Sequence, residues 1–424
     1  MKIMVVGGGG REHAIIKKIK ENKKVEQIFA LPGNGGMVGD AIPVPIGAKD
    51  IDKIVEFAVK EKIDFAVVAP DDPLVLGCVD ALLEAGIPAF GPKACAAIIE
   101  GSKVFSKNLM KKYNIPTAEY EVFDNAEAAL EYVKSCPIPT VIKADGLALG
   151  KGVIIATDRE MACDAVRSIM TDKKFGDSGN QIVIEEFLTG PEVSVLAFTD
   201  GNVVVPMVSS MDHKRALDND EGLNTGGMGT VAPNPYYTDD IAKVCMDEIF
   251  LPTIRAMKNE GREFRGCLYF GLMLTPKGPR VIEYNCRFGD PETQVVLPLL
   301  ESDLLDIMMA TASGNLEKCE VKFTNKAACC VIMASSGYPE KYESGYEITI
   351  DPTVRDNVYV AGAKIVDEKL VNAGGRVLGV TSVEDTLDAA IKSAYEKVRL
   401  VKFENAYYRS DIGAKAMKAL RGDA

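Results

Sequence analysis

The stretch Arg280–Thr293, RVIEYNCRFGDPET, reads as a strand followed by a charged loop that a glycine interrupts. Alternate side chains on a strand share a face, so Val281, Glu283 and Asn285 are predicted to point one way and the side chains between them into a core. A carboxylate and a carboxamide oxygen at this spacing are hard ligands that Mg²⁺ accepts, with phosphates and water completing its shell. The alternative is a half-exposed strand whose polar residues only face water.

The composition is that of a soluble globular protein with several domains. A length of 424 residues predicts two to four domains, and 47% hydrophobic with 26% charged residues is ordinary for such proteins. The formal net charge of −12 argues against nucleic acid or an anionic membrane surface as the main partner. Any phosphate ligand must therefore be held by local cations, backbone amides or a metal ion.

The cysteines and the N-terminus indicate a cytoplasmic location. None of the 10 cysteines forms a C-x-x-C pair, and Cys329 and Cys330 lie in an apolar run, as free thiols in a reducing compartment do. The apolar run Ile3–Val6 is too short for a signal peptide, and no window approaches the length of a membrane span. We expect no membrane partner.

Residues 1–100 alternate strand and helix patterns, which predicts a parallel, doubly wound sheet. Ligands of such sheets bind at the carboxyl ends of the strands. Polar residues and glycines gather at those predicted ends, in Gly7–Gly10, Pro32–Gly36 and Pro70–Pro73.

The rest of the chain divides into two further units. Residues 101–325 begin with a helix, continue through a small α/β unit over about 121–188, and then form longer strands. Residues 326–424 are predicted to form a compact α+β unit. Its long helix is predicted to open near Ser382, where the spacing resembles a capping box.

The glycine cluster VVGGGGREH lies between a predicted strand and a predicted helix, where backbone amides can meet a phosphate. The third glycine of a dinucleotide fingerprint would fall at Glu12, and no acid follows the second strand near Leu31. A phosphosugar bound by Gly7–Gly10 and Arg11 is therefore favoured over NAD. The alternative is a tight turn needed only for packing.

Two other stretches combine glycines with cations. In KADGLALGKG, Lys143 ends a predicted strand and Lys151 sits in the loop of a hairpin, which could cover phosphates or be an ordinary hairpin. Residues 209–229, SSMDHKRALDNDEGLNTGGMG, are too polar for a core and favour a binding loop over a solvated one. For His213 itself, a structural, hydrogen-bonded role is the alternative.

These residues together resemble the ATP-grasp ligases, and in particular the glycinamide ribonucleotide synthetase family. The strings that carry the resemblance are GGREH, PGN, EGSK, KADGLALGKGV, EEFL, DHKR, NTGGMG and NCRFGDPET, and it extends from residue 3 to the C-terminal YRSDIG. The resemblance implies an α/β fold with an N-terminal doubly wound domain (1–100), a central ATP-grasp domain with a mobile lid (101–325, lid about 121–188) and a C-terminal α+β domain (326–424).

The resemblance also implies a reaction. Members join glycine to 5-phosphoribosylamine in de novo purine biosynthesis, through glycyl phosphate, and release ADP and phosphate. The rivals are another ATP-grasp ligase of the same pathway and a non-catalytic, nucleotide-sensing protein on the same fold. The implied partners are small molecules only, with no nucleic acid, and we expect a monomer.

The family motifs assign roles to residues of this chain. ATP is assigned to Lys103, Lys143, Gly146, Gly150, Lys151, Gly152, Glu185, Phe187, Leu188 and Glu192. Phosphoribosylamine is assigned to Gly7, Gly8, Gly9, Gly10, Arg11, Asn34, Asp71 and Pro73. Mg²⁺ or Mn²⁺ is assigned to Glu283 and Asn285, and glycine with its chemistry to Asp212, Lys214, Arg287 and Asp290. The strand CLYFGLML lacks the carboxylate that many relatives use as a second metal ligand, so ligands beyond those two stay open.

Overall fold

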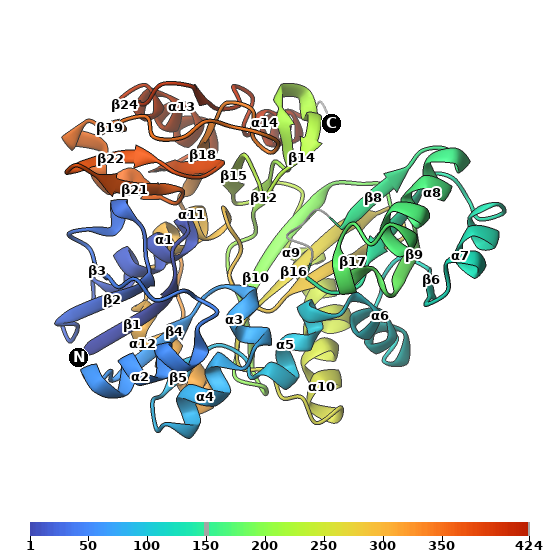
Figure 1. The fold of residues 1–424 in the computed structure, drawn as a ribbon, viewed down its shortest axis with the longest axis horizontal. Coiled ribbons are helices and arrows are strands. Elements are labelled where there is room, and N and C mark those ends of the chain that lie inside the picture. The colour runs from blue at the N-terminus through green and yellow to red at the C-terminus, as the bar shows by residue number, and fades with distance from the viewer. Residues whose placement is uncertain (148–151, 423–424) are drawn as a thin grey trace.

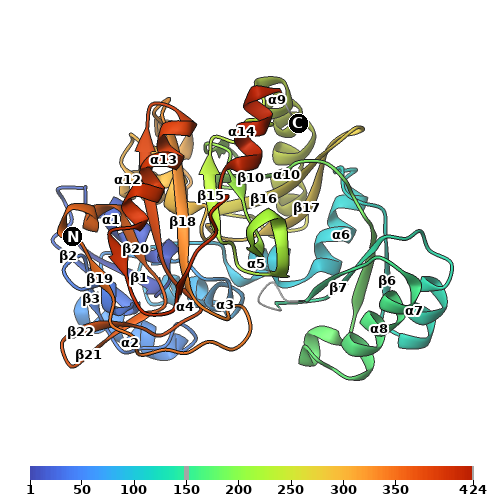
Figure 2. The same ribbon diagram turned by 90° about the horizontal axis from the view of Figure 1, so that it is seen from above.

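The computed structural model describes residues 1–147 and 152–422. An N-terminal α/β unit and a C-terminal α+β unit lie on one side of a central sheet, and a smaller α/β unit, the lid unit, lies on the other side (Figures 1 and 2). No helix in the described part of the chain is long and apolar enough to cross a membrane.

The N-terminal unit is the parallel, doubly wound sheet that the sequence predicts. Its strands run in the order β3-β2-β1-β4-β5, and every pairing is parallel. Its elements are β1 (Lys2–Gly7), α1 (Gly10–Ile19), β2 (Gln27–Pro32), β3 (Ile42–Pro43), α2 (Ile51–Glu61), β4 (Phe65–Val68), α3 (Asp71–Val75), α4 (Cys78–Glu84) and β5 (Ala89–Phe90). The carboxyl ends of β1 and β4 lie side by side, so the glycine cluster and Asp71 start neighbouring helices.

The lid unit is a four-stranded sheet, β6-β9-β7-β8, with two helices beside it. It contains β6 (Tyr120–Phe123), α7 (Ala126–Val133), β7 (Thr140–Ala144), β8 (Val153–Ala156), α8 (Arg159–Val166) and β9 (Ile182–Glu186). The predicted hairpin is confirmed, since β7 pairs antiparallel with β8. The helices α5 (Ala94–Gly101) and α6 (Lys103–Lys112) connect the N-terminal unit to it.

The central sheet, β11-β10-β16-β17, carries the stretch with which the sequence analysis began. It consists of β10 (Glu192–Thr199), β11 (Val204–Pro206), β16 (Gly266–Thr275) and β17 (Gly278–Asn285). The helices α9 (Asp239–Cys245) and α10 (Leu251–Asn259) lie beside it, α12 (Leu304–Ser313) contacts both β16 and β5 of the N-terminal sheet, and α11 (Thr293–Val296) packs against α1 and the C-terminal unit. Buried Phe250 and Phe270, with ring centroids 4.3 Å apart, anchor the helix layer to the sheet.

The C-terminal unit is built on the sheet β12-β15-β18-β23-β20, with β25 paired to β18. Its elements are β18 (Ala327–Ser335), β19 (Thr349–Ile350), β20 (Val358–Val360), β21 (Ala363–Val366), β22 (Lys369–Asn372), β23 (Arg376–Glu384), α13 (Leu387–Val398), β24 (Val401–Lys402), β25 (Ala406–Tyr407) and α14 (Ala414–Arg421). Two strands of this sheet, β12 (Met211–Asp212) and β15 (Gly229–Ala232), come from an earlier part of the chain than residues 326–424. The hairpin β13 (Arg215–Leu217) with β14 (Glu221–Asn224) lies between them in sequence.

Two local predictions were wrong. Opposite Gly271 and Leu272 the partners are Glu283 and Val281, so Ile282 is an extra residue in a β-bulge. The bulge breaks the alternation, and Val281 is buried in the same core as Tyr284 instead of sharing a face with Glu283. The long C-terminal helix starts at Leu387 with Thr386 as its cap, because β23 continues through Ser382 to Glu384.

Candidate active site

The end of β17 presents Glu283 and Asn285 together. Both follow the bulge at Ile282, so they still lie two residues apart on one face of the strand. The Asn285 Oδ1 atom accepts a 3.4 Å hydrogen bond from Arg287 Nη2. Burial raises the pKa of Glu283, but Lys214, Lys143, Lys103 and Arg287 outweigh it and leave that pKa below its usual value. Positive charge from four segments of the chain therefore converges on one carboxylate.

Three lysines lie on the side of the lid unit. Lys143 Nζ, on β7, lies 3.0 Å from Glu185 Oε1 and donates to the carbonyl of Ile282 at 3.1 Å. Lys107, which the sequence analysis missed, pairs with the other oxygen of Glu185 at 3.0 Å, and burial lowers the pKa of Lys107 to about 8. Lys103 donates to the carbonyl of Gly146 at 2.8 Å, so it holds the base of the lid hairpin.

Arg287 is fixed by a second residue that the sequence analysis missed. Glu100 accepts a 2.7 Å hydrogen bond from Arg287 Nη2 and another, also 2.7 Å, from the Cys286 backbone N–H. Burial raises the pKa of Glu100. Burial would also raise the pKa of Asp71, but Arg287 and Arg11 lower it. Arg287 therefore stands between a carboxylate from α5 and one from the first turn of α3.

Lys214 faces two carboxylates of the central sheet. Its Nζ atom lies 3.5 Å from Glu192 Oε2 and 3.7 Å from Glu283 Oε1. The negative charges of Glu192 and Glu283 raise the pKa of Lys214, so this lysine stays protonated. Lys214 thus links the proposed metal strand to β10, on which Glu192 is the first residue.

Asp212 lies two residues before Lys214, in the same polar stretch of residues 209–229. Burial and the nearby carboxylate of Glu292 raise the pKa of Asp212 well above its usual value. Glu292 itself is buried and accepts a 3.3 Å hydrogen bond from Ser194, whose hydroxyl lies 2.8 Å from the Tyr269 hydroxyl. A carboxylate pair of this kind favours an incoming cation.

His213 has a structural role, as the alternative reading of the sequence held. The carbonyl of Gly229 accepts a 3.0 Å hydrogen bond from the ring Nδ1, and the Gly413 N–H donates to Nε2 at 3.1 Å. The ring is therefore neutral, with its proton on Nδ1, and burial lowers its pKa to about 4. The His213 ring therefore connects residues 209–229 to Gly413, near the C-terminus.

The glycine cluster begins α1, but several of its polar groups are already engaged. Glu12 accepts a 2.5 Å hydrogen bond from the Gly9 N–H, and Asp290 accepts one of 3.2 Å from the Arg11 N–H. The Arg11 guanidinium pairs with Glu12 at 2.6 Å and donates to the carbonyl of Phe288. Arg11 thus joins the N-terminal unit to the Arg287–Pro291 loop.

The remaining predicted residues of the N-terminal unit lie around the glycine cluster and the start of α3. Asn34 donates to the carbonyls of Gly8 (2.9 Å) and Val360 (2.8 Å), which holds the glycine cluster against the C-terminal unit. Pro73 is buried in α3, two residues after Asp71. Gly7 and Gly10 lie at the end of β1 and the start of α1.

The predicted nucleotide residues outside the lysine cluster are only partly placed. Phe187 and Leu188 are half-buried and follow β9 directly, where that strand leads into the central sheet. The carbonyl of Gly152 accepts from the Ala144 N–H at 2.8 Å, which closes the described part of the hairpin. Gly150 and Lys151 lie outside the described residues.

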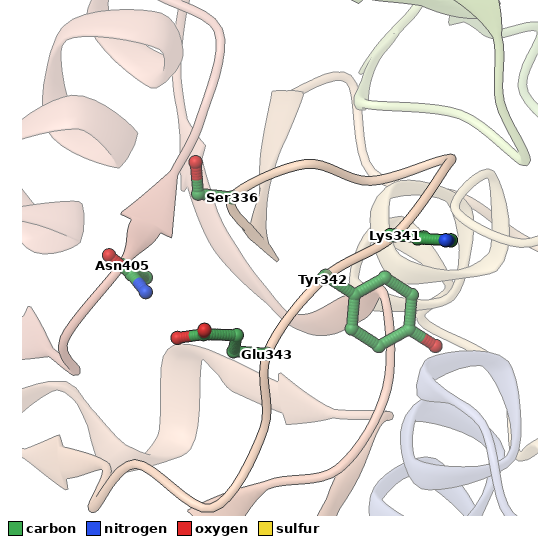
Figure 3. Close-up of a pocket in the computed structure, with 5 residues that line it drawn as sticks. All are labelled: Ser336, Lys341, Tyr342, Glu343 and Asn405. Carbon is green, nitrogen blue, oxygen red and sulfur yellow. The ribbon is translucent and has the colours of Figure 1, made fainter.

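A pocket of about 460 Å³ lies away from this site, on the C-terminal unit (Figure 3). It is lined by Ser336, Lys341, Tyr342, Glu343 and Asn405. The carboxylate of Glu343 points toward Asn405, whereas Lys341 and Tyr342 point away from them (Figure 3). The cations that converge on Glu283 do not line this pocket, so we do not assign the chemistry to it.

The donor atoms fit a divalent ion that phosphates help to hold. Within residues 1–147 and 152–422, no group of three or more His, Cys, Asp or Glu residues forms a complete metal site. Glu283 and Asn285 supply hard oxygen donors, and the cations around them suit the phosphates that would complete the shell. The site therefore fits a metal that arrives with a nucleotide.

Three family models match the chain in consecutive segments. They are described as phosphoribosylglycinamide synthetase N domain (residues 1–100), ATP-grasp (A) domain (101–293) and C domain (328–415).

Known proteins similar to this chain match it over nearly its whole length. A phosphoribosylamine–glycine ligase from Clostridium acetobutylicum is 46% identical over 97% of this chain and 99% of its own. The crystal structure of the Thermotoga maritima phosphoribosylamine–glycine ligase has a TM-score of 0.87 at 34% identity and covers 97% of this chain and 100% of its own. A biotin carboxylase domain from Hydrogenobacter thermophilus has a TM-score of 0.75 at 15% identity, covers 99% of this chain and 93% of its own, and shares the fold alone.

Proposed function

This chain belongs to the phosphoribosylglycinamide synthetase family, and we propose that its central sheet and the loops around it join glycine to 5-phosphoribosylamine. The reaction is an ATP-dependent, ADP-forming ligation of purine biosynthesis. The cations around Glu283 support this location of the active site, because transfer of a phosphoryl group needs positive charges that are already in place.

The first step activates glycine. A carboxylate is a poor electrophile, so a glycine oxygen attacks the γ-phosphorus of ATP, the bond to the β-phosphate oxygen breaks, and glycyl phosphate and ADP form. Lys103 and Lys143 would neutralise ATP phosphates, and Lys214 with Arg287 would face the glycine carboxylate. Asp212, beside Glu292, would hold the glycine ammonium group, since a cation relieves the repulsion between those two carboxylates.

The second step forms the amide. The amine of phosphoribosylamine attacks the acyl carbon, the carbon–oxygen bond to phosphate breaks, and the nitrogen loses a proton. We place the phosphoribosyl group at the carboxyl ends of β1 and β4, near Gly8 and Asp71. Glu12 and Asp290 already accept from two N–H groups there, so the sugar phosphate would have to use other donors.

The nucleotide and its metal ion complete the assignment. We place adenine beside Glu185, Phe187 and Leu188, and the ribose beside Glu192. Glu283 and Asn285 would hold the divalent ion, for which we propose Mg²⁺ or Mn²⁺. When bound, such an ion supplies positive charge to the phosphate oxygens.

Omission of each substrate tests the proposal. Release of ADP should require glycine, and formation of glycinamide ribonucleotide should require glycine, ATP and freshly made phosphoribosylamine together. Formate or bicarbonate in place of glycine separates this activity from those of other ATP-grasp ligases. Product formed with formate or bicarbonate and not with glycine would refute the proposal. ADP release at the same rate with glycine, formate, bicarbonate or none of them would also refute it.

We also propose that the enzyme is a cytoplasmic monomer. The cysteines of the described residues are free, and consecutive Cys329 and Cys330 of β18 are buried in two different cores. Free thiols in a core are typical of a reducing compartment. Light scattering on the purified protein would test the oligomeric state.

A further inference from the structure

Arg376, the first residue of β23, reaches from the C-terminal unit into two loops of the candidate active site. Its Nη1 atom donates to the carbonyls of Gly226 at 2.6 Å, Gly227 at 3.4 Å and Asp290 at 2.7 Å. Its Nη2 atom lies 3.5 Å from Asp290 Oδ1. One guanidinium therefore joins the glycine-rich loop (residues 225–229) to the Arg287–Pro291 loop.

The two loops that Arg376 joins also pack closely against each other. A Cβ atom on Gly226 would lie 2.8 Å from Arg376 Cζ. A Cβ atom on Gly227 would lie 2.5 Å from Pro291 Cδ and 2.6 Å from Asp212 Oδ1. Gly227, at a φ of 115°, thus fills the space between Asp212 and the Arg287–Pro291 loop, and only glycine fits there.

A second residue of the C-terminal unit holds the same loop. The Gly226 N–H donates to the Tyr338 hydroxyl at 3.1 Å, so both backbone polar groups of Gly226 are bound by that unit. The Tyr338 ring packs on Gly375, where an added Cβ would come within 2.1 Å of the ring. Tyr338 and Arg376 therefore each form a hydrogen bond with Gly226 of the glycine-rich loop.

The link continues into the N-terminal unit. Asp290 accepts from the Arg11 N–H at 3.2 Å and from Gln294 Nε2 at 2.9 Å, in addition to its contact with Arg376. Each of its carboxylate oxygens thus accepts one hydrogen bond from a protein group, which fixes the orientation of the side chain.

We propose that Arg376 is a positioning residue that sets the distance between the loop of Asp212 and the loop of Asp290, and through it the sites for glycine and phosphoribosylamine. This inference rests on the proposed function. It makes the C-terminal unit a determinant of substrate affinity, although Arg376 lies outside the strands and lysines assigned to ATP. Displacement of such a loop by about 1 Å can cost on the order of 100-fold in rate.

The test compares Arg376→Met with Arg376→Lys and with Arg399→Met, an exposed arginine of the same unit. Arg376→Met should lower kcat/KM for glycine by roughly 10- to 100-fold while KM for ATP changes by less than about 2-fold. Arg376→Lys should recover part of the loss, because an ammonium can reach one carbonyl but cannot span both loops. Arg399→Met should behave as the wild type.

Tyr338→Phe decides the matter if Arg376→Met does not fold. It keeps the ring on Gly375 and removes only the acceptor of the Gly226 N–H, so kcat/KM for glycine should fall by about 3- to 10-fold with ATP unaffected. Equal losses for ATP and glycine, or no loss in either variant, would overturn the inference. Failure of the proposed function would be seen separately, as a wild-type protein that forms no glycinamide ribonucleotide.

Discussion

Glu283→Ala is expected to reduce turnover by more than about 100-fold without unfolding the protein. Glu283 is half-exposed at the end of β17, so its loss leaves no cavity in the core. It is, however, the carboxylate on which Lys214, Lys143 and Lys103 converge, and the one charged donor that we assign to the divalent ion.

Two contributions to the loss can be separated by size. The first is the pair with Lys214, at 3.7 Å, with both side chains 37% exposed. An unscreened estimate of about 4 kcal/mol at an effective dielectric constant of about 20 falls to about 1 kcal/mol or less once solvent is allowed for. The second is the charged metal ligand, for which several kcal/mol of transition-state stabilisation is typical. A loss of about 3 kcal/mol corresponds to more than 100-fold in rate.

The assay is steady-state ADP release with saturating glycine and phosphoribosylamine, titrated with Mg²⁺. Glu192→Ala is the matched control, because Glu192 also faces Lys214, at 3.5 Å, but is assigned to the ribose. Glu283→Ala should raise the Mg²⁺ requirement, whereas Glu192→Ala should raise KM for ATP only. If Glu283→Ala keeps more than about a tenth of the wild-type rate, a loss under roughly 1.4 kcal/mol, or if both variants shift the Mg²⁺ titration equally, the metal assignment is wrong.

Three further variants test other parts of the site. Lys143→Met should raise KM for ATP and leave KM for glycine near its wild-type value, since a point charge on phosphate oxygens is lost; equal effects on both would move Lys143 elsewhere. Gly9→Ala should raise KM for phosphoribosylamine but not for ATP, because the new Cβ would lie 2.8 Å from a Glu12 oxygen and 3.2 Å from an Asp290 oxygen; an unchanged KM would argue against the phosphosugar site. Because the pKa of His213 falls from 6.5 to about 4 on folding, the unfolded chain binds more protons between those values, and stability drops as pH falls through that window. Between pH 7 and pH 5 the wild type should lose about 2 kcal/mol more than His213→Asn in denaturant unfolding, and parallel losses would show that this ring does not titrate as described.

The alternation of strands and helices in residues 1–100 was enough to predict the parallel sheet, because that pattern has few other folded solutions. The face assignment on β17 failed at one residue. Period-2 reasoning assumes an unbroken ladder, and the bulge at Ile282 depends on the partner strand β16, which the sequence of β17 alone does not describe. Glu283 and Asn285 stayed together because both follow the bulge.

Two of the missed residues had a signal in the sequence and one did not. Lys107 lies one helical turn after Lys103, so the two lysines share a face of α6. Glu100 belongs to the quoted string EGSK but was assigned no partner. Arg376 acts through carbonyls contributed by residues up to 150 positions away, and only the folded chain brings those carbonyls together.

The contact between His213 and Gly413 has a consequence for the order in which the enzyme is made. The ring accepts from a backbone group 200 residues further along the chain. At a synthesis rate of about 5–20 residues per second, the His213 segment waits roughly 10 to 40 s for its partner to be translated. Until then the Nε2 atom of His213 lacks the donor that it has in the folded chain. The segment that holds the proposed glycine ligands therefore cannot complete this contact until residue 413 has left the ribosome, when the synthesis of the 424-residue chain is almost over.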